Sequence, residues 1–330
     1  MAPCLRERFS FRRKLTWFLL AGLVVLLVIV GPFAFARLRC DATAVSVTRL
    51  ANHPVGATLN EGLRVGCYNI AHGRGEGFGT SVWDGGSDRE RRQRLTDIGR
   101  LLRDLDLDVV VLNEVDFDAQ WSHGVDQARA VADAGGFAFV ARQRNVDIAT
   151  VVANFRFGNA VLSRFPISAA RCVRYPAMSR FERVMAGNHD GLIATVELPD
   201  GTGVDVWAVH LETRSTKSRR QAAARIIEQT AASPRAVILA GDFNSRSIGS
   251  IRPPSIPRGL SAIDTMLATG LYQACPARSK TAPGTFPTVA PSLTIDWIFA
   301  PADWRILQAQ VVDARMSDHL PVAALLVPGG

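Results

Sequence analysis

Cysteine is scarce in this 330-residue sequence, and the five that occur fit no familiar framework. The spacings of Cys4, Cys40, Cys67, Cys172 and Cys275 match no zinc-binding pattern, and an odd number does not indicate a set of disulfides. We expect Cys67 to be a small core residue, because it lies in an apolar segment. The sequence does not establish whether Cys172 and Cys275 form a disulfide.

Internal repeats, low-complexity tracts and two common enzyme signatures are also missing. The sequence has no G-x-S-x-G motif and no P-loop, so neither a serine nucleophile on a sharp turn nor a triphosphate-binding loop is indicated. Instead, 48% of the residues are hydrophobic and 21% are charged, with 16 Phe and 6 Trp available for a core. This composition excludes a disordered chain and a collagen-like chain.

Positive charge exceeds negative charge by 8, but half of this excess lies in the first 14 residues. Residues 1–14 hold five Arg or Lys and one Glu, which leaves a formal charge of only +4 for the rest of the chain. A high isoelectric point is typical of nucleic-acid-binding proteins. Here half of the excess positive charge lies in a short N-terminal arm, so net charge does not favour nucleic acid as the partner.

A long apolar run follows the basic residues. Residues 15–36 are 22 consecutive uncharged residues, and about 20 apolar residues suffice for a helix to cross a bilayer. Basic residues before such a run favour a cytoplasmic N-terminus. We therefore expect residues 1–14 to be a cytoplasmic arm, residues 15–36 a transmembrane anchor, and the rest to lie outside the cytoplasm. A cleaved signal peptide is the alternative, because Ala34-Phe35-Ala36 fits a cleavage site and the protein would then be secreted.

Regular secondary structure is expected beyond the apolar run. Residues 37–61 lack periodicity and are predicted to be a tether. Leucines at helical spacing over residues 88–105 predict a helix, and continuous apolar runs at 109–112 and 236–240 predict buried strands. Strands and helices mix without strict alternation, so we predict one α/β domain with mixed sheets over residues 62–328.

Several predicted strands end in polar side chains. In open sheets, ligands bind beyond the ends of the strands, where loops converge. Each of these side chains taken singly is explained by a turn, a cap or a solvated strand end. Their joint occurrence is what indicates a site, and its members are Asn69, Glu114, His210, Asp242, Asn244, Asp296, Asp318 and His319.

These residue types suit metal-assisted phosphoester hydrolysis. The oxygen donors of Asn69, Glu114 and Asp318 suit a hard cation such as Mg²⁺, with Mn²⁺ as the alternative. Asp242 would serve as a base for water, and two histidines would supply proton transfer or phosphate contact. Asp296 lies inside an apolar strand, where an unpaired carboxylate is costly, so we expect it to pair with an imidazolium.

Seven short segments resemble, in order, the motifs of the endonuclease/exonuclease/phosphatase superfamily of DNase I-like metal-dependent phosphodiesterases. They are YNI at 68–70, LNEV at 112–115, GNAVLSR at 158–164, VHL at 209–211, GDFN at 241–244, IDWIF at 295–299 and SDHLPV at 317–322. The resemblance implies a four-layer sandwich of two mixed β-sheets flanked by helices. It departs from the apurinic endonucleases at Ala71, where those enzymes carry an acidic residue, so a DNA-repair role is not indicated.

The resemblance also implies a role for each position. Glu114 matches the principal metal-binding carboxylate, with Asn69 and Asp318 as direct or water-mediated ligands. Around the phosphate, Asp242 would activate the attacking water and Asn244 would contact the phosphoryl oxygens. His319 matches the active-site histidine, held by Asp296, and His210 matches a second histidine. Asn159 matches a polar residue that lines the phosphate site.

Taken together, these observations predict a Mg²⁺-dependent phosphoester hydrolase that acts outside the cytoplasm. A nearby membrane favours a phospholipid or lipid-linked substrate, and extracellular nucleic acid is the alternative substrate. An inactive relative that acts as a binding module is the alternative of a different class. The oligomeric state is left open.

Overall fold

The computed structural model describes residues 13–28, 30–31, 44–59, 61–77, 79–150, 153–176, 179, 189–247, 261–276 and 284–329. Residues 13–28 are helical. Within the described ranges, however, no helix combines the length and the apolar character needed to cross a membrane. The membrane-spanning prediction for residues 15–36 is therefore not confirmed, and the predicted cleavage position after Ala36 and residues 1–12 of the basic arm lie outside the described residues.

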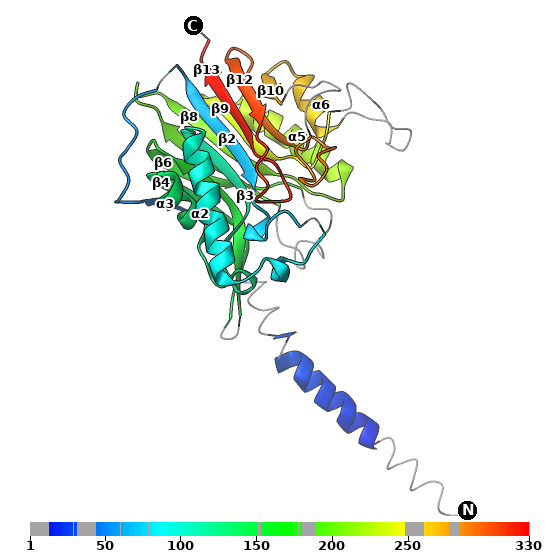
Figure 1. Cartoon of the computed structure of the whole chain (residues 1–330). Helices are drawn as coiled ribbons and strands as arrows, with labels where there is room; N and C mark the ends of the chain where they lie inside the picture. Colours follow the sequence, from blue (N-terminus) through cyan, green and yellow to red (C-terminus); the bar gives the residue numbers. More distant parts are fainter. Residues whose placement is uncertain are drawn as a thin grey trace, which may run out of the picture.

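Two mixed sheets form the body of the described chain (Figure 1). The first sheet has the strand order β1 (Val45–Arg49), β4 (Phe139–Ala149), β5 (Asn154–Ser163), β3 (Val109–Ala119), β2 (Leu63–Asn69), β13 (Val322–Val327) and β12 (Arg305–Val311). The second sheet has the order β10 (Tyr272–Cys275), β11 (Asp296–Pro301), β9 (Ala236–Asp242), β8 (Gly203–His210), β7 (Gly191–Glu197) and β6 (Ile167–Val173). In each sheet a parallel pair, β2–β3 or β8–β9, lies among antiparallel neighbours.

Helices cover the outer face of each sheet, which gives four layers (Figure 1). The helices α2 (Asp88–Asp104) and α3 (Gln127–Gly135) pack on the first sheet, and α5 (Thr216–Ala231) and α6 (Ala262–Leu267) pack on the second. Alternate strand residues from both sheets fill the central layer between them. Short 3₁₀ turns lie at Ala71–Gly73, Val82–Asp84 and Gln120–Ser122. The four-layer sandwich expected from the sequence is confirmed.

Local sequence explains where the best-defined helix begins and which face it buries. Ser87 accepts a hydrogen bond from the Glu90 amide, and the Glu90 carboxylate accepts one from the Ser87 amide, so α2 starts with a capping box. Leu95, Ile98 and Leu102 lie three or four residues apart and are fully buried against the first sheet. This burial stabilises the helix and fixes the loop that precedes it.

The register of the parallel pairs brings the polar strand ends together. In the first sheet Asn69 lies opposite Asn113, and in the second sheet Asp242 lies opposite both His210 and Asp296. Parallel strands end at the same edge of a sheet. The ends of β2 and β3 therefore meet those of β8 and β9 at one end of the sandwich.

Three strands correct the expectations from the sequence. Residues 45–49 were predicted to belong to a tether, but they form β1, which pairs with β4 at the edge of the first sheet. The strands β6 and β10 were not expected, and they form the two edges of the second sheet. The strands β1 and β6 are half exposed and carry weak apolar patterns, so periodicity does not reveal them.

The Cys172–Cys275 disulfide does not form. Cys172 lies on β6 and Cys275 on β10, at opposite edges of the six-stranded sheet. Five interstrand spacings separate them by about 24 Å, whereas a disulfide requires Cα atoms within about 7 Å. Cys67 is buried in the core between the sheets, as the apolar segment predicted.

Candidate active site

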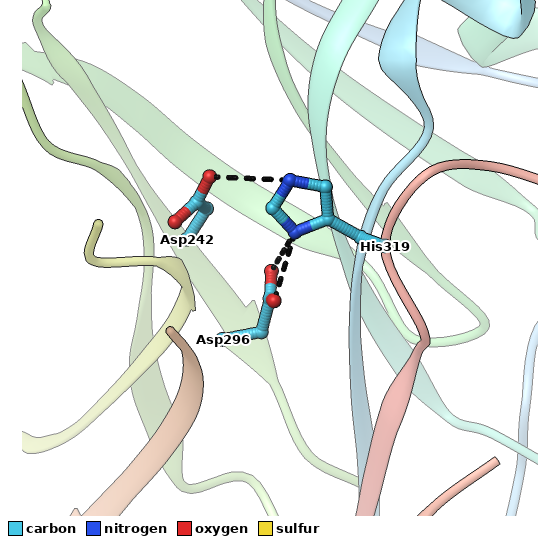
Figure 2. Close-up of side chains that lie close together, drawn as sticks. All are labelled: Asp242, Asp296 and His319. Atoms are coloured by element: carbon cyan, nitrogen blue, oxygen red, sulfur yellow. Dashed lines mark hydrogen bonds and ion pairs between the residues drawn. The ribbon is translucent and has the colours of Figure 1, made fainter. Parts of the chain in front are cut away.

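A buried histidine lies between two carboxylates where the two sheets meet (Figure 2). The His319 Nδ1 donates to Asp296, at 2.9 and 3.1 Å from the two carboxylate oxygens, and its Nε2 lies 3.8 Å from Asp242 Oδ2. Burial alone lowers the pKa of His319, but the charge and hydrogen bond of Asp296 outweigh burial and raise it to about 10. The partner expected for Asp296 is therefore present, and the imidazolium is favoured at neutral pH.

The second carboxylate, Asp242, is surrounded by donors. Its Oδ1 accepts from the Asn244 amide at 2.7 Å, and its Oδ2 lies 3.8 Å from both His210 Nε2 and His319 Nε2. Burial, followed by the negative charge of Asp296, raises the pKa of Asp242 to about 7. A carboxylate with this pKa accepts a proton effectively near neutral pH.

The Asn244 side chain faces Asp242 and the protein backbone. Its Nδ2 donates to the Leu211 carbonyl at 2.9 Å and to Asp242 Oδ2 at 3.3 Å. Both amide protons are thus used, so in this structure Asn244 orients Asp242 and does not offer the phosphoryl contact expected from the resemblance.

Glu114 lies on the other side of the same site, on β3, in a left-handed backbone conformation with φ of 52°. Its oxygens lie 3.6 Å from His72 Nε2 and 3.9 Å from His210 Nε2, and Oε1 accepts from Asn69 Nδ2 at 3.2 Å. Burial opposes ionisation, but His72, His210 and His319 outweigh burial and lower the pKa of Glu114 to about 2. Glu114 is therefore an ionised carboxylate at a strained position, as is common at functional sites.

Two predicted metal ligands are oriented differently from the expectation. The Asn69 Nδ2 bridges Glu114 and Asp242, and its Oδ1 accepts from the Ala71 amide at 3.0 Å. Asn69 therefore holds the two carboxylates together and does not turn its oxygen toward them. Asp318 forms a buried ion pair with Arg74, which comes from the glycine-rich loop after β2. Burial raises the pKa of Asp318, although His319 and Arg74 oppose this shift.

Asn159 lies one layer behind the site. It is fully buried, its Nδ2 donates to Gln143 Oε1 and to the Asp190 carbonyl, each at 2.9 Å, and its Oδ1 accepts from Asn113 Nδ2 at 2.8 Å. The Asn113 Oδ1 in turn accepts from the Asp242 amide at 2.9 Å. Asn159 therefore positions Asp242 through Asn113 and does not line the phosphate site as expected.

Sequence reasoning missed His72, which completes the site beside Glu114. His72 follows β2 within Ala71–Gly73, and its Nδ1 lies 2.7 Å from Asp116 Oδ1. Burial lowers the pKa of His72, but the charge and hydrogen bond of Asp116 outweigh burial and raise it above the ordinary value. A single histidine in a glycine-rich loop carries no sequence signal, and its acidic partner is 44 residues away.

The arrangement of carboxylates fits a divalent cation. Glu114 and Asp242 accept from one shared amide, Asn69 Nδ2, so two acidic side chains face each other across a short gap. The Nε2 of His210, close to both, is buried without a hydrogen-bond partner among the described residues. Ionised oxygens in such proximity repel each other, and a hard cation removes this repulsion.

Asp242, Asp296 and His319 also lie close enough to hold an ion by distance alone. The His319 Nδ1 and the Asp296 oxygens are already hydrogen-bonded to each other, however, which consumes the donor atoms that an ion would need. The Glu114 carboxylate is therefore the better candidate for a cation, and the His319–Asp296 pair acts as a hydrogen-bonding unit.

Comparison with known proteins agrees with this geometry. The family model described as "Endonuclease/Exonuclease/phosphatase family" matches residues 66–319. No curated protein sequence matches the chain significantly. A solved structure of an endonuclease/exonuclease/phosphatase from Beutenbergia cavernae shares 25% identity and a TM-score of 0.60, covering 81% of this chain and 72% of that chain.

Two functionally described proteins share the fold at lower identity. A mannosyl-6-phosphatase from Bacteroides thetaiotaomicron is 18% identical, with a TM-score of 0.57 over 80% of this chain and 99% of that chain. The human Nocturnin catalytic domain is 16% identical, with a TM-score of 0.56 over 86% of this chain and 97% of that chain. With the family model covering most of the sequence and the site assembled from its motifs, the chain belongs to the endonuclease/exonuclease/phosphatase family.

Proposed function

We propose that the protein is a divalent-metal-dependent phosphoester hydrolase. The observation that carries this proposal is the position of Asp242 Oδ2, which lies 3.8 Å from the imidazole nitrogens of both His210 and His319 while Asn69 links it to Glu114. A base, two imidazole donors and an ionised carboxylate thus converge on one point. Family membership supports the same chemistry, because this is a family of phosphoester hydrolases.

Each side chain has a task in the proposed reaction. Asp242 accepts a proton from the attacking water and is held in place by Asn244 and Asn69. The imidazolium of His319, held by Asp296, donates from Nε2 to a phosphoryl oxygen and stabilises charge that develops there.

Glu114 is the residue that would hold the cation, while Asp242 keeps its role as the base. When bound, Mg²⁺ or Mn²⁺ supplies Lewis-acid neutralisation of a phosphate oxygen. Asp318 would join Glu114 only after it releases Arg74, and Asn69 only after its amide turns over.

The sequence of residues 1–36 supports a proposal about the location of the enzyme. We propose that the domain acts outside the cytoplasm, since a basic arm and a 22-residue uncharged run precede it. Fractionation of cells that express the full chain tests this, and recovery of the protein with cytoplasmic markers would contradict it. The proposal of a phospholipid or lipid-linked substrate rests on this location, because it would place the active site near lipid head groups.

Hydrolysis of generic phosphoesters tests the activity itself. We expect the purified chain to cleave bis-p-nitrophenyl phosphate or p-nitrophenyl phosphate with Mg²⁺ and to lose this activity in EDTA. Plasmid DNA and detergent-dispersed phospholipid in parallel reactions distinguish a nuclease from a phospholipase. The matched pair of variants is Asp242→Asn in the site and Asp205→Asn, a buried aspartate elsewhere on the second sheet. Metal binding without turnover on any of these substrates would favour an inactive binding module.

A further inference from the structure

A small cavity opens beside Glu114 and His210, and neither His319 nor Asp296 is among the described residues that line it. Its volume is about 180 Å³. Besides Glu114 and the backbone of Gly158, the lining consists of three imidazoles, an amide, an aromatic ring and a hydroxyl, from His72, His189, His210, Asn145, Phe157 and Thr213. Pockets for drug-sized ligands measure roughly 300–1,000 Å³. This cavity therefore suits a compact polar group adjoining the site of phosphate attack.

A buried network fixes the orientation of His72 at the wall of the cavity. Asp116 is fully buried, accepts from Trp121 Nε1 at 2.8 Å, and lies 2.7 Å from His72 Nδ1. Gln127 makes a hydrogen bond to the backbone of each member of the His72–Asp116 pair. Its Oε1 accepts from the Asp116 amide at 3.0 Å, and its Nε2 donates to the His72 carbonyl at 2.7 Å. With Nδ1 committed to Asp116, the Nε2 atom is the one turned toward Glu114 at 3.6 Å.

The backbone of His72 shows that this placement is costly. Its φ is 55°, in the left-handed region, which residues other than glycine rarely adopt, although asparagine, aspartate and histidine do so more often than the rest. Its ring also packs edge-to-face on Trp121 and Phe157, with centroid distances of 5.8 and 5.1 Å. A strained residue that so many contacts hold in one orientation indicates a task at the cavity.

Asn145 contributes a hydrogen-bond donor to the same cavity. Its Oδ1 accepts from Gln143 Nε2 at 3.0 Å and from the Asp190 amide at 3.2 Å. The oxygen is thereby fixed, and the Nδ2 group is the donor that the side chain has left. The His210 Nε2 at the border with Glu114 is buried without a hydrogen-bond partner among the described residues. A buried polar atom of this kind is satisfied when a polar ligand occupies the cavity.

We propose that this cavity is the subsite for the organic group of the phosphoester, and that this group is a small polyhydroxylated alcohol such as a sugar. This inference rests on the proposed hydrolase function. Hydroxyl groups both donate and accept, so they pair with the Asn145 amide and with His72 Nε2 in either of its protonation states. Phe157 provides an apolar face for the C–H groups of a ring. The small volume disfavours a nucleoside, and the polar lining disfavours an acyl chain.

A comparison of substrates tests the subsite. We expect wild-type kcat/KM to be higher for hexose phosphates and glycerol phosphate than for p-nitrophenyl phosphate and a mononucleotide, with Mg²⁺ present. The test variant is His72→Asn. The asparagine amide keeps a donor near the position of Nδ1 for Asp116, tolerates the left-handed backbone, and removes Nε2. The chain offers a matched control in His123→Asn, because His123 also has a left-handed φ of 60° and lies exposed outside the cavity.

The ratio of kcat/KM for the preferred sugar phosphate to that for p-nitrophenyl phosphate is the readout. It should fall about 10-fold in His72→Asn, the loss expected for one hydrogen bond to substrate, and stay unchanged in His123→Asn. Asn145→Asp, which keeps Oδ1 and replaces the Nδ2 donor, should lower the same ratio.

Two failures are distinguishable. If the wild type hydrolyses none of the phosphoesters, the proposed function is wrong. If it hydrolyses p-nitrophenyl phosphate but prefers the mononucleotide, or if the ratio survives His72→Asn and Asn145→Asp, the hydrolase stands and the polyol subsite is overturned.

Discussion

The pairing of Asp296 with His319 makes a quantitative prediction about pH. In the Asp296→Asn variant the charge that raises the pKa of His319 to about 10 is lost, while burial, which lowers it, remains. Asp242 and Asp318 still oppose the effect of burial, so we expect the pKa to fall to the ordinary histidine value of about 6.5. At pH 8 the imidazolium fraction drops from about 0.99 to about 0.03, which is about a 30-fold loss, whereas at pH 6 the loss is below about 2-fold.

The pH–rate profile of the two proteins checks this reasoning. We expect wild-type kcat/KM to rise through about pH 7, where Asp242 ionises, and then to hold up to alkaline pH. The ratio of the Asp296→Asn rate to the wild-type rate should fall from about pH 6.5 upward. An NMR titration of the His319 ring measures the underlying pKa directly. Asp205→Asn, in which a buried aspartate bound to Thr195 is neutralised, controls for loss of a buried charge. A rate loss equal at pH 6 and pH 8 would refute the electrostatic role and leave only a packing role.

Three further outcomes follow from the contacts. Asp242→Asn should lower kcat by about 1,000-fold, as expected for loss of a general base, with an unchanged circular dichroism spectrum. Asn159→Ala should lower the free energy of unfolding by about 3 kcal/mol in urea titrations, because it withdraws three hydrogen bonds from buried partners including Asn113. A loss below about 1 kcal/mol would contradict that positioning role. Mass spectrometry of the non-reduced protein should find no disulfide between Cys172 and Cys275, since they lie at opposite edges of the second sheet; a peptide that links the two would contradict the strand order.

The sequence predicts the central strands of the fold because they are buried on both faces. The residues of β3 and β9 form continuous apolar runs, and each run ends in the polar residues that build the site. The edge strands β1 and β6 lack this signal. In β1, which was taken for a tether, no residue is fully buried, and its place is set by pairing with β4 far along the chain.

The sequence allowed us to predict which residues form the site, but not how their side chains are oriented. Glu114, Asp242, Asp296, His210 and His319 converge as the resemblance implied. Which atom of an amide faces a carboxylate depends on neighbours from other strands, and sequence spacing does not encode that choice.

Asn159 shows the same limit most plainly. Its type and position suit a polar wall of the phosphate site, yet Gln143, Asn113 and the Asp190 carbonyl use all of its hydrogen-bonding groups. The Arg74–Asp318 pair was hidden for a similar reason, because Arg74 lies in a glycine-rich loop whose path has no periodic signature.

Binding of Mn²⁺ is the most direct test of the proposed metal centre. Isothermal titration of the wild-type chain should show one Mn²⁺ site, and Glu114→Gln, which removes only the charge of the ionised carboxylate, should abolish both that binding and the hydrolysis of bis-p-nitrophenyl phosphate. Asp205→Asn should bind Mn²⁺ like the wild type. Full hydrolysis in EDTA, or undiminished Mn²⁺ binding by Glu114→Gln, would contradict the assignment of this site.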